Sequence, residues 1–164
     1  MWWCNHKTKE MIEKMPTFAD FVELIKSGSK EGEQVIANKH PKKIQTERLT
    51  LIREINLIND VRYKIRFGEE VIGQIQILHR GEVKYEFFNP KRYGRRGMMT
   101  EALKAVLEKT PRRHLFVIID DWNFKSKAVA LKCGFQLLNN TDSAYESLHQ
   151  GYQTYGYEKN TTQK

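Results

Sequence analysis

A basic glycine loop runs directly into an amphipathic helix in the middle of this chain, and this feature constrains the fold more than any other. The loop covers Tyr93–Gly97, and the helical pattern starts at Met98. Glycine lets a backbone approach a ligand closely, the first N–H groups of a helix lack partners within the helix, and the helix dipole favours negative charge there. The segment therefore predicts a backbone pocket for an anion such as a phosphate group.

A second segment has the pattern of a strand followed by a helix. The apolar run Leu115–Ile119 predicts a buried strand, Asp120–Asn123 a turn, and Gly134 the end of a short helix. Asn123 and Ser126 stand where this helix begins, so their side chains are candidates both for capping the helix and for contacting a ligand.

The rest of the chain alternates in a way that predicts a mixed α/β fold. From Arg48 to Phe88 the apolar residues recur every second position, which indicates an antiparallel meander. We expect strands near 48–57, 61–67, 70–78 and 82–88, a helix over 98–108, a strand at 114–119, a helix over 126–133, and β-prone segments at 135–139 and 151–157. We divide the chain into an N-terminal helical extension with a linker (1–45), a main domain (46–158) and a short tail (159–164).

Positive charge is concentrated around the glycine loop. The 164 residues carry a net charge of +8, and residues 89–114 hold 8 Lys/Arg against 2 Asp/Glu, an excess of 6. Such a patch suits a phosphorylated cofactor held by arginines, and it equally suits a nucleic-acid backbone. Charge alone leaves both partners open.

The composition also gives expectations about location and metals. No run of about 18 apolar residues could span a membrane, and Met1–Asn5 lacks the pattern of a secretion signal, so we expect a cytoplasmic protein. Cys4 and Cys133 are too few and too far apart for a zinc site, so we expect no metal.

Several motifs in the same order resemble the GCN5-related N-acetyltransferase (GNAT) superfamily. They are Thr46–Leu51, Glu82–Tyr85, Arg96–Leu103 and the segment from Asn123 to Phe135, and they are similar to the branch of ribosomal-protein N-terminal and spermidine acetyltransferases. The resemblance implies a mostly antiparallel central sheet with splayed strands and flanking helices. One departure stands out: the family has two helices between its first two strands, whereas here only Ile58–Asp60 separates them.

The resemblance also implies an activity, namely direct transfer of an acetyl group from acetyl-CoA to a primary amine. The acceptor would be a protein N-terminus or a small amine. The residues expected to hold the coenzyme are Phe88, Asn89, Arg92, Arg95, Arg96, Gly97, Met98, Met99, Thr100, Asn123 and Ser126. Among them, a backbone N–H near Phe88 or Asn89 would polarise the thioester carbonyl.

Candidates for moving protons are Glu82 and Glu86 as bases and a C-terminal tyrosine as acid. The two glutamates have even spacing on one strand and so are expected to share a face. Tyr145 is the first choice for the acid, with Tyr152 and Tyr155 as further candidates.

Two other functions remain open from the sequence. The glutamate and tyrosine that serve some GNAT enzymes are replaced here by Ile118 and Ala130, which motivates a non-catalytic acyl-CoA-binding or regulatory domain. A basic nucleic-acid-binding protein is disfavoured, because only Tyr93 supplies an aromatic ring within the basic patch. The sequence leaves the acceptor open, and also the choice between a monomer and a homodimer.

Overall fold

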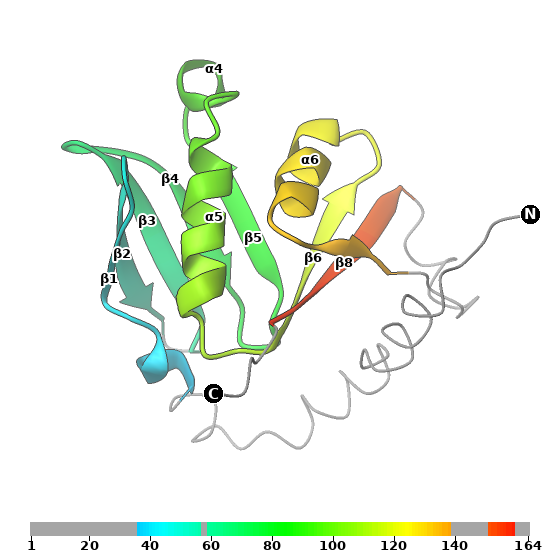
Figure 1. The fold of residues 1–164 in the computed structure, drawn as a ribbon, viewed down its shortest axis with the longest axis horizontal. Coiled ribbons are helices and arrows are strands. Elements are labelled where there is room, and N and C mark those ends of the chain that lie inside the picture. The colour runs from blue at the N-terminus through cyan, green and yellow to red at the C-terminus, as the bar shows by residue number, and fades with distance from the viewer. Residues whose placement is uncertain (1–35, 57–58, 139–150, 160–164) are drawn as a thin grey trace, which may run out of the picture.

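The computed structural model describes residues 36–56, 59–138 and 151–159. Its first five strands form one antiparallel sheet in chain order (Figure 1). They are β1 (Lys43–Gln45), β2 (Thr50–Ile55), β3 (Val61–Phe67), β4 (Glu70–Ile77) and β5 (Val83–Phe87). This is the expected meander, and β3 begins and ends as predicted.

In the second half of the chain, the described residues form three helices and a smaller sheet. The helices are α4 (Pro90–Tyr93), α5 (Met98–Lys109) and α6 (Phe124–Lys132). The strands are β6 (His114–Asp120), β7 (Gln136–Leu137) and β8 (Tyr152–Glu158), ordered β6-β8-β7 and antiparallel.

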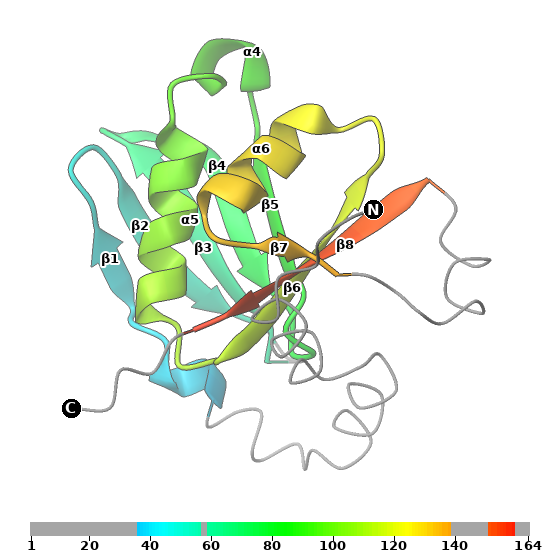
Figure 2. The ribbon, with the colours of Figure 1, turned by 45° about the vertical axis from the view of Figure 1, so that its right-hand side comes forward.

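The two sheets meet at one end and separate at the other. A parallel bridge joins Glu82 to Phe116, and the Phe116 N–H donates to the Gly81 carbonyl at 3.1 Å. From this joint β5 and β6 diverge, as Figures 1 and 2 show from two directions. The predicted mixed α/β fold with splayed strands is confirmed, and the opening between β5 and β6 is the feature that can admit a ligand.

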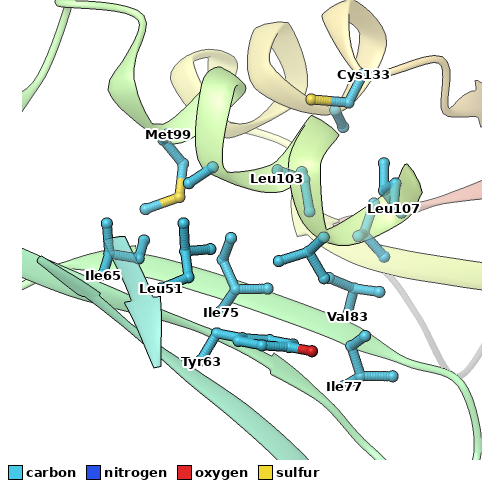
Figure 3. Close-up of a cluster of buried hydrophobic side chains, with 14 of the residues drawn as sticks. Leu51, Tyr63, Ile65, Ile75, Ile77, Val83, Met99, Leu103, Leu107 and Cys133 are labelled. Atoms are coloured by element: carbon cyan, nitrogen blue, oxygen red, sulfur yellow. The ribbon is translucent and has the colours of Figure 1, made fainter. Parts of the chain in front are cut away.

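Helix α5 covers one face of the large sheet and completes the core. Met99 and Leu103 point from α5 toward Leu51 and Ile75 on the strands, and Leu107 lies further along the same helix (Figure 3). All five side chains are at least 95% buried. Burying side chains of this size contributes about 1.5–3 kcal/mol each, so the core fixes the position of α5 and of the loop that precedes it.

The two faces of β5 differ in character because side chains alternate along a strand. Val83, Tyr85 and Phe87 face α5 and pack in or against the core, whereas Lys84 and Glu86 are exposed on the opposite face. Polar groups on that opposite face therefore remain accessible to an approaching molecule.

Two short elements escaped prediction. The segment assigned to a linker contains β1, and the glycine loop is preceded by the single-turn helix α4. The extension expected over residues 1–45 lies outside the described residues up to residue 35, and the division into three parts stays a prediction.

His40 gives the fold a testable dependence on pH. The ring is 2% exposed, and among the described residues neither ring nitrogen finds a hydrogen-bond partner. Burial, with the positive charges of Arg112 and Arg53, lowers the pKa of His40 from 6.5 to about 4. An unfolded chain takes up this proton near pH 6.5 and the folded chain does not, so the free energy of unfolding falls as the pH drops from 6.5 to about 4.

The expected loss over this range is about 3 kcal/mol. Urea unfolding of wild type and His40→Leu between pH 4 and pH 8 measures it. The variant should lose less stability than wild type below pH 6.5, the histidine's ordinary pKa, and match its trend above. Equal slopes for the two proteins would contradict the assignment.

Candidate functional site

The glycine loop connects β5 to α5 through backbone conformations that few residues adopt. Asn89 caps α4 by accepting a hydrogen bond from the Arg92 N–H at 3.1 Å. Arg95 and Gly97 then have positive φ angles of 64° and 72°. The left-handed conformation at Gly97 starts α5 sharply, so the chain turns back over the sheet immediately before the helix.

The start of α5 presents backbone donors at the end of the molecule where β5 and β6 are apart (Figure 1). Met98 and Met99 are 2% and 5% exposed, so their side chains belong to the core and only their N–H groups are available to a ligand. The first-turn N–H groups of a helix lack partners within the helix. Arg95 and Arg96 are exposed beside them and add positive charge.

Arg92, which was also expected to bind the coenzyme, pairs with a carboxylate of the protein. Its guanidinium lies 3.3 Å from the Glu70 carboxylate, and the Tyr93 hydroxyl bonds to the same carboxylate. These contacts tie α4 to the start of β4. Arg92 is therefore less free to bind a phosphate than Arg95 or Arg96.

The hydrogen-bond pattern of β5 corrects the expectation for Phe88. Its N–H donates to the Ile72 carbonyl at 2.9 Å, and the Glu82 carbonyl accepts from Leu78 at 2.8 Å, so even-numbered residues of this strand direct their backbone groups toward β4. Alternate residues of an antiparallel strand point the opposite way. The backbone N–H groups of Tyr85 and Phe87 thus face the opening toward β6, while that of Phe88 is used within the sheet.

The two candidate bases have different surroundings. Glu82 is 5% exposed at the joined end of the sheets, and its carboxylate binds Arg80, with the Arg80 Nε at 3.0 Å, and lies 3.6 Å from Lys84 Nζ. This corrects the expectation that Glu82 is available beside the opening, because a buried and paired carboxylate serves structure. Glu86 is exposed nearer the open end.

Glu86 is oriented by a polar row that crosses three strands. Gln74 Nε2 donates to Glu86 Oε1 at 2.6 Å, and Lys64 Nζ donates to Gln74 Oε1 at 3.1 Å. Because an ammonium group can only donate, the Gln74 amide must turn its NH₂ toward Glu86. Oε1 of Glu86 thus already accepts one hydrogen bond, and Oε2 is the better placed of the two oxygens to take a proton.

Asn123 and Ser126 lie where predicted, at the start of α6. The Asn123 side chain accepts from the Ser126 N–H at 3.1 Å and caps the helix. Ser126 contacts Tyr85, a residue that the sequence did not single out: the Tyr85 hydroxyl donates to the Ser126 carbonyl at 2.8 Å and lies 2.9 Å from its Oγ. Burial raises the pKa of Tyr85 to about 12, so this phenol keeps its proton and links β5 to α6.

The tyrosines expected as acids include one that the structure does not describe and two that it does. Tyr145 lies outside the described residues, and Tyr155 is 5% exposed with its hydroxyl bonded to Gln153 at 2.8 Å. Tyr152 is 52% exposed at the start of β8. The described residues thus supply no clear acid from this group.

From the sequence we expect neither a bound metal nor a membrane-spanning segment. Within residues 36–56, 59–138 and 151–159 no three His, Cys, Asp or Glu side chains gather as a metal site would require, and the absence of a metal stays a prediction. In the same residues no helix has the length and apolar character needed to cross a membrane.

We next compare the chain and its fold with known proteins. No curated protein matches the chain. Among solved structures, the microcin C7 self-immunity acetyltransferase MccE, in complex with acetyl-CoA and AMP, aligns with a TM-score of 0.55 and 14% identity over 74% of this chain and 98% of its own. An acetyltransferase from Agrobacterium tumefaciens gives 0.54 and 20%, over 71% and 94%.

A putative ribosomal-protein-serine acetyltransferase from Vibrio cholerae also aligns, with a TM-score of 0.52 and 17% identity over 71% of this chain and 97% of its own. At these identities the likeness concerns the fold. The acetyltransferase (GNAT) domain matches residues 13–136, which is more than half of the sequence. The chain therefore belongs to the acetyltransferase (GNAT) domain family.

Proposed function

We propose that this GNAT acetyltransferase transfers the acetyl group of acetyl-CoA directly to a primary amine, which is a protein N-terminus or a small amine. One observation carries the proposal: the free N–H groups at the start of α5 lie at the same end of the molecule as the opening between β5 and β6. A ligand with a phosphate end and a thioester end can bind both places at once.

The coenzyme would be held mainly by backbone groups. N–H groups from Arg95 to Thr100 would bind the diphosphate, with the exposed Arg95 and Arg96 as countercharge. The pantetheine arm would then pass between β5 and β6, beside Asn123 and Ser126 at the start of α6. The Asn123 side chain already caps α6, and that of Ser126 already contacts Tyr85. Each would therefore bind the pantetheine arm only through hydrogen-bonding groups not used in these contacts.

The thioester carbonyl would be polarised by an N–H of β5. Since Phe88 donates to Ile72, the alternating register favours Tyr85 and Phe87, and Asn89 has the same parity. Hydrogen-bond donors fixed in advance at the developing oxyanion are a large source of catalysis in acyl transfer.

Glu86 would act as the base. In the transfer, the amine nitrogen forms a bond to the carbonyl carbon, the carbon–sulfur bond breaks, and Glu86 Oε2 takes the amine proton. Coenzyme A leaves as a thiolate; Glu86 then releases its proton to the solvent, and the thiolate takes up one proton from the solvent. Tyr85 is a poor donor to the thiolate, because its pKa of about 12 lies above that of a thiol, about 8.5. We assign Tyr85 to positioning α6.

A thermal-shift titration of the full chain tests the coenzyme part of the proposal. Acetyl-CoA at about a hundred times its dissociation constant should stabilise the fold by about 2.7 kcal/mol. A short duplex DNA, tested in parallel, should have no such effect at physiological salt. Stabilisation by DNA alone would contradict the proposal and reassign the basic loop to nucleic acid.

Acetyl transfer to a panel of amines and N-terminal peptides tests the chemistry. Release of free coenzyme thiol that depends on an amine is the expected result. If acetyl-CoA binds and no amine is acetylated, the chain is a non-catalytic acyl-CoA-binding domain.

We further propose that the enzyme acts in the cytoplasm.

A further inference from the structure

Glu101 has a position that conflicts with phosphate binding unless its charge is balanced. It lies in the first turn of α5, and its N–H donates to the Gly97 carbonyl at 2.9 Å. A carboxylate suits the positive end of a helix dipole, but it repels an anion bound at the same turn. Something must therefore hold this charge away from the ligand.

Two residues from the β1–β2 turn take up the whole carboxylate. Oε1 accepts from Thr46 Oγ1 at 2.5 Å and from the Arg48 N–H at 3.0 Å. Oε2 accepts from Arg48 Nε at 2.7 Å and lies 2.6 Å from Arg48 Nη2. Burial alone would raise the pKa of Glu101, but the hydrogen bonds from Thr46 and Arg48 outweigh it and hold the pKa below its ordinary value. The group is thus ionised at neutral pH.

Arg48 also contacts the loop itself. Its Nη1 donates to the Arg96 carbonyl at 3.0 Å, next to the left-handed residue Gly97. The guanidinium therefore joins three segments that are distant in sequence: the β1–β2 turn, the last loop residue before Gly97, and the first turn of α5. The planar fork of arginine binds a carboxylate with two nitrogens and a carbonyl with the third, a geometry that a lysine ammonium does not reproduce.

The contacts fix the backbone conformation on which the donors depend. A non-glycine residue such as Arg95 with a positive φ costs about 1–3 kcal/mol and persists only where its surroundings hold it. By holding the Arg96 carbonyl, Arg48 constrains the residue between the two left-handed positions. The guanidinium nitrogens are thereby used within the protein, so Arg48 is a poor direct ligand for phosphate.

We propose that Thr46, Arg48 and Glu101 form a clip that holds the glycine loop in its diphosphate-binding conformation. They are positioning residues that act through the loop, and the inference rests on the proposed binding of acetyl-CoA there. The clip and a simple charge effect predict opposite changes in acetyl-CoA affinity when Glu101 is neutralised. If Glu101 acted only as a charge, Glu101→Gln would bind acetyl-CoA more tightly, whereas loss of the clip weakens binding.

The test measures dissociation constants by calorimetry for acetyl-CoA and for S-acetylpantetheine, which lacks the diphosphate. Arg48→Lys keeps the charge and loses the fork, and Glu101→Gln keeps the size and loses the charge. In both variants the dissociation constant of acetyl-CoA should rise about tenfold, which is about 1.4 kcal/mol. That of S-acetylpantetheine should stay unchanged. Arg66→Lys is the matched control, because Arg66 pairs with the exposed Glu69 at 3.2 Å in the β3–β4 turn and this ion pair is not part of the clip.

Three outcomes would overturn the clip: wild-type affinity in both variants, tighter binding in Glu101→Gln, or equal weakening of both ligands. Failure of wild type to bind acetyl-CoA would instead refute the proposed function. If either variant fails to fold by circular dichroism, Thr46→Val removes one hydrogen bond of the clip and replaces it in the same comparison.

Discussion

Replacing Glu86 by glutamine should slow acetyl transfer by about 10²- to 10⁴-fold, the usual contribution of a general base. The glutamine side chain has the same shape and could still meet Gln74, but it has no lone pair basic enough to take the amine proton. Acetyl-CoA affinity should stay near the wild-type value, because the carboxylate lies on the face of β5 opposite α5. The measurement is amine-dependent release of coenzyme thiol at saturating acetyl-CoA, with affinity measured separately.

Glu82→Gln is the matched control, since it makes the same change four residues earlier in the chain. Glu82 is buried against Arg80, so this variant should lose stability, by about 1.5–3 kcal/mol, and keep most of its rate per folded molecule. A Glu86→Gln enzyme as fast as wild type would remove Glu86 from the mechanism. Loss of rate in Glu82→Gln without loss of stability would exchange the two roles.

The contrast between these glutamates shows where sequence reasoning stops. Their even spacing predicts that both side chains leave the strand on the same face, because side-chain alternation is a local rule. Their accessibility differs because Glu82 is buried and Glu86 is not. The contact of Glu82 with Arg80 is local, but the burial of Glu82 depends on the joint with β6. That joint unites segments about 34 residues apart, and no local pattern encodes it.

The fold was predictable where local patterns are long. Val61, Tyr63 and Ile65 alternate over a complete strand, and β3 was predicted to the residue. β1 has three residues with Ile44 as its only apolar side chain, and it is a strand because β2 pairs with it. α4 offered a signal that was missed, namely Asn89 as a helix cap followed by proline at the first helical position.

The candidate site also has parts that local sequence patterns predict and parts that they do not. The glycine loop and the start of α5 could be predicted because glycine, helix end and charge act within about ten residues. The contact of Arg48 with Glu101 spans 53 residues, and that of Tyr85 with Ser126 spans 41. Motifs that seemed to mark only an opening strand, such as Thr46–Leu51, acquire a role once the fold brings them to the loop.

Gly97→Glu should abolish the stabilisation by acetyl-CoA while the protein stays folded. The substitution places a carboxylate at the residue that caps the start of α5, where the diphosphate is proposed to bind, and like charges repel there. Wild type should melt about 5–10 °C higher with saturating acetyl-CoA, and the variant should show no shift. Thermal melting with and without ligand measures both.

Gly68→Glu provides a control matched in strain as well as in charge. Gly68 has a φ of 60° and Gly97 a φ of 72°, so a side chain at either position costs about 1–2 kcal/mol of backbone energy. Neither site is crowded: a Cβ at Gly68 meets nothing within 4 Å, and one at Gly97 meets Arg48 Nη2 only at 3.8 Å. The two variants should therefore melt at similar temperatures without ligand, and only Gly68→Glu should respond to acetyl-CoA. If both respond as wild type does, the coenzyme binds away from the loop, and the basic glycine segment needs another explanation.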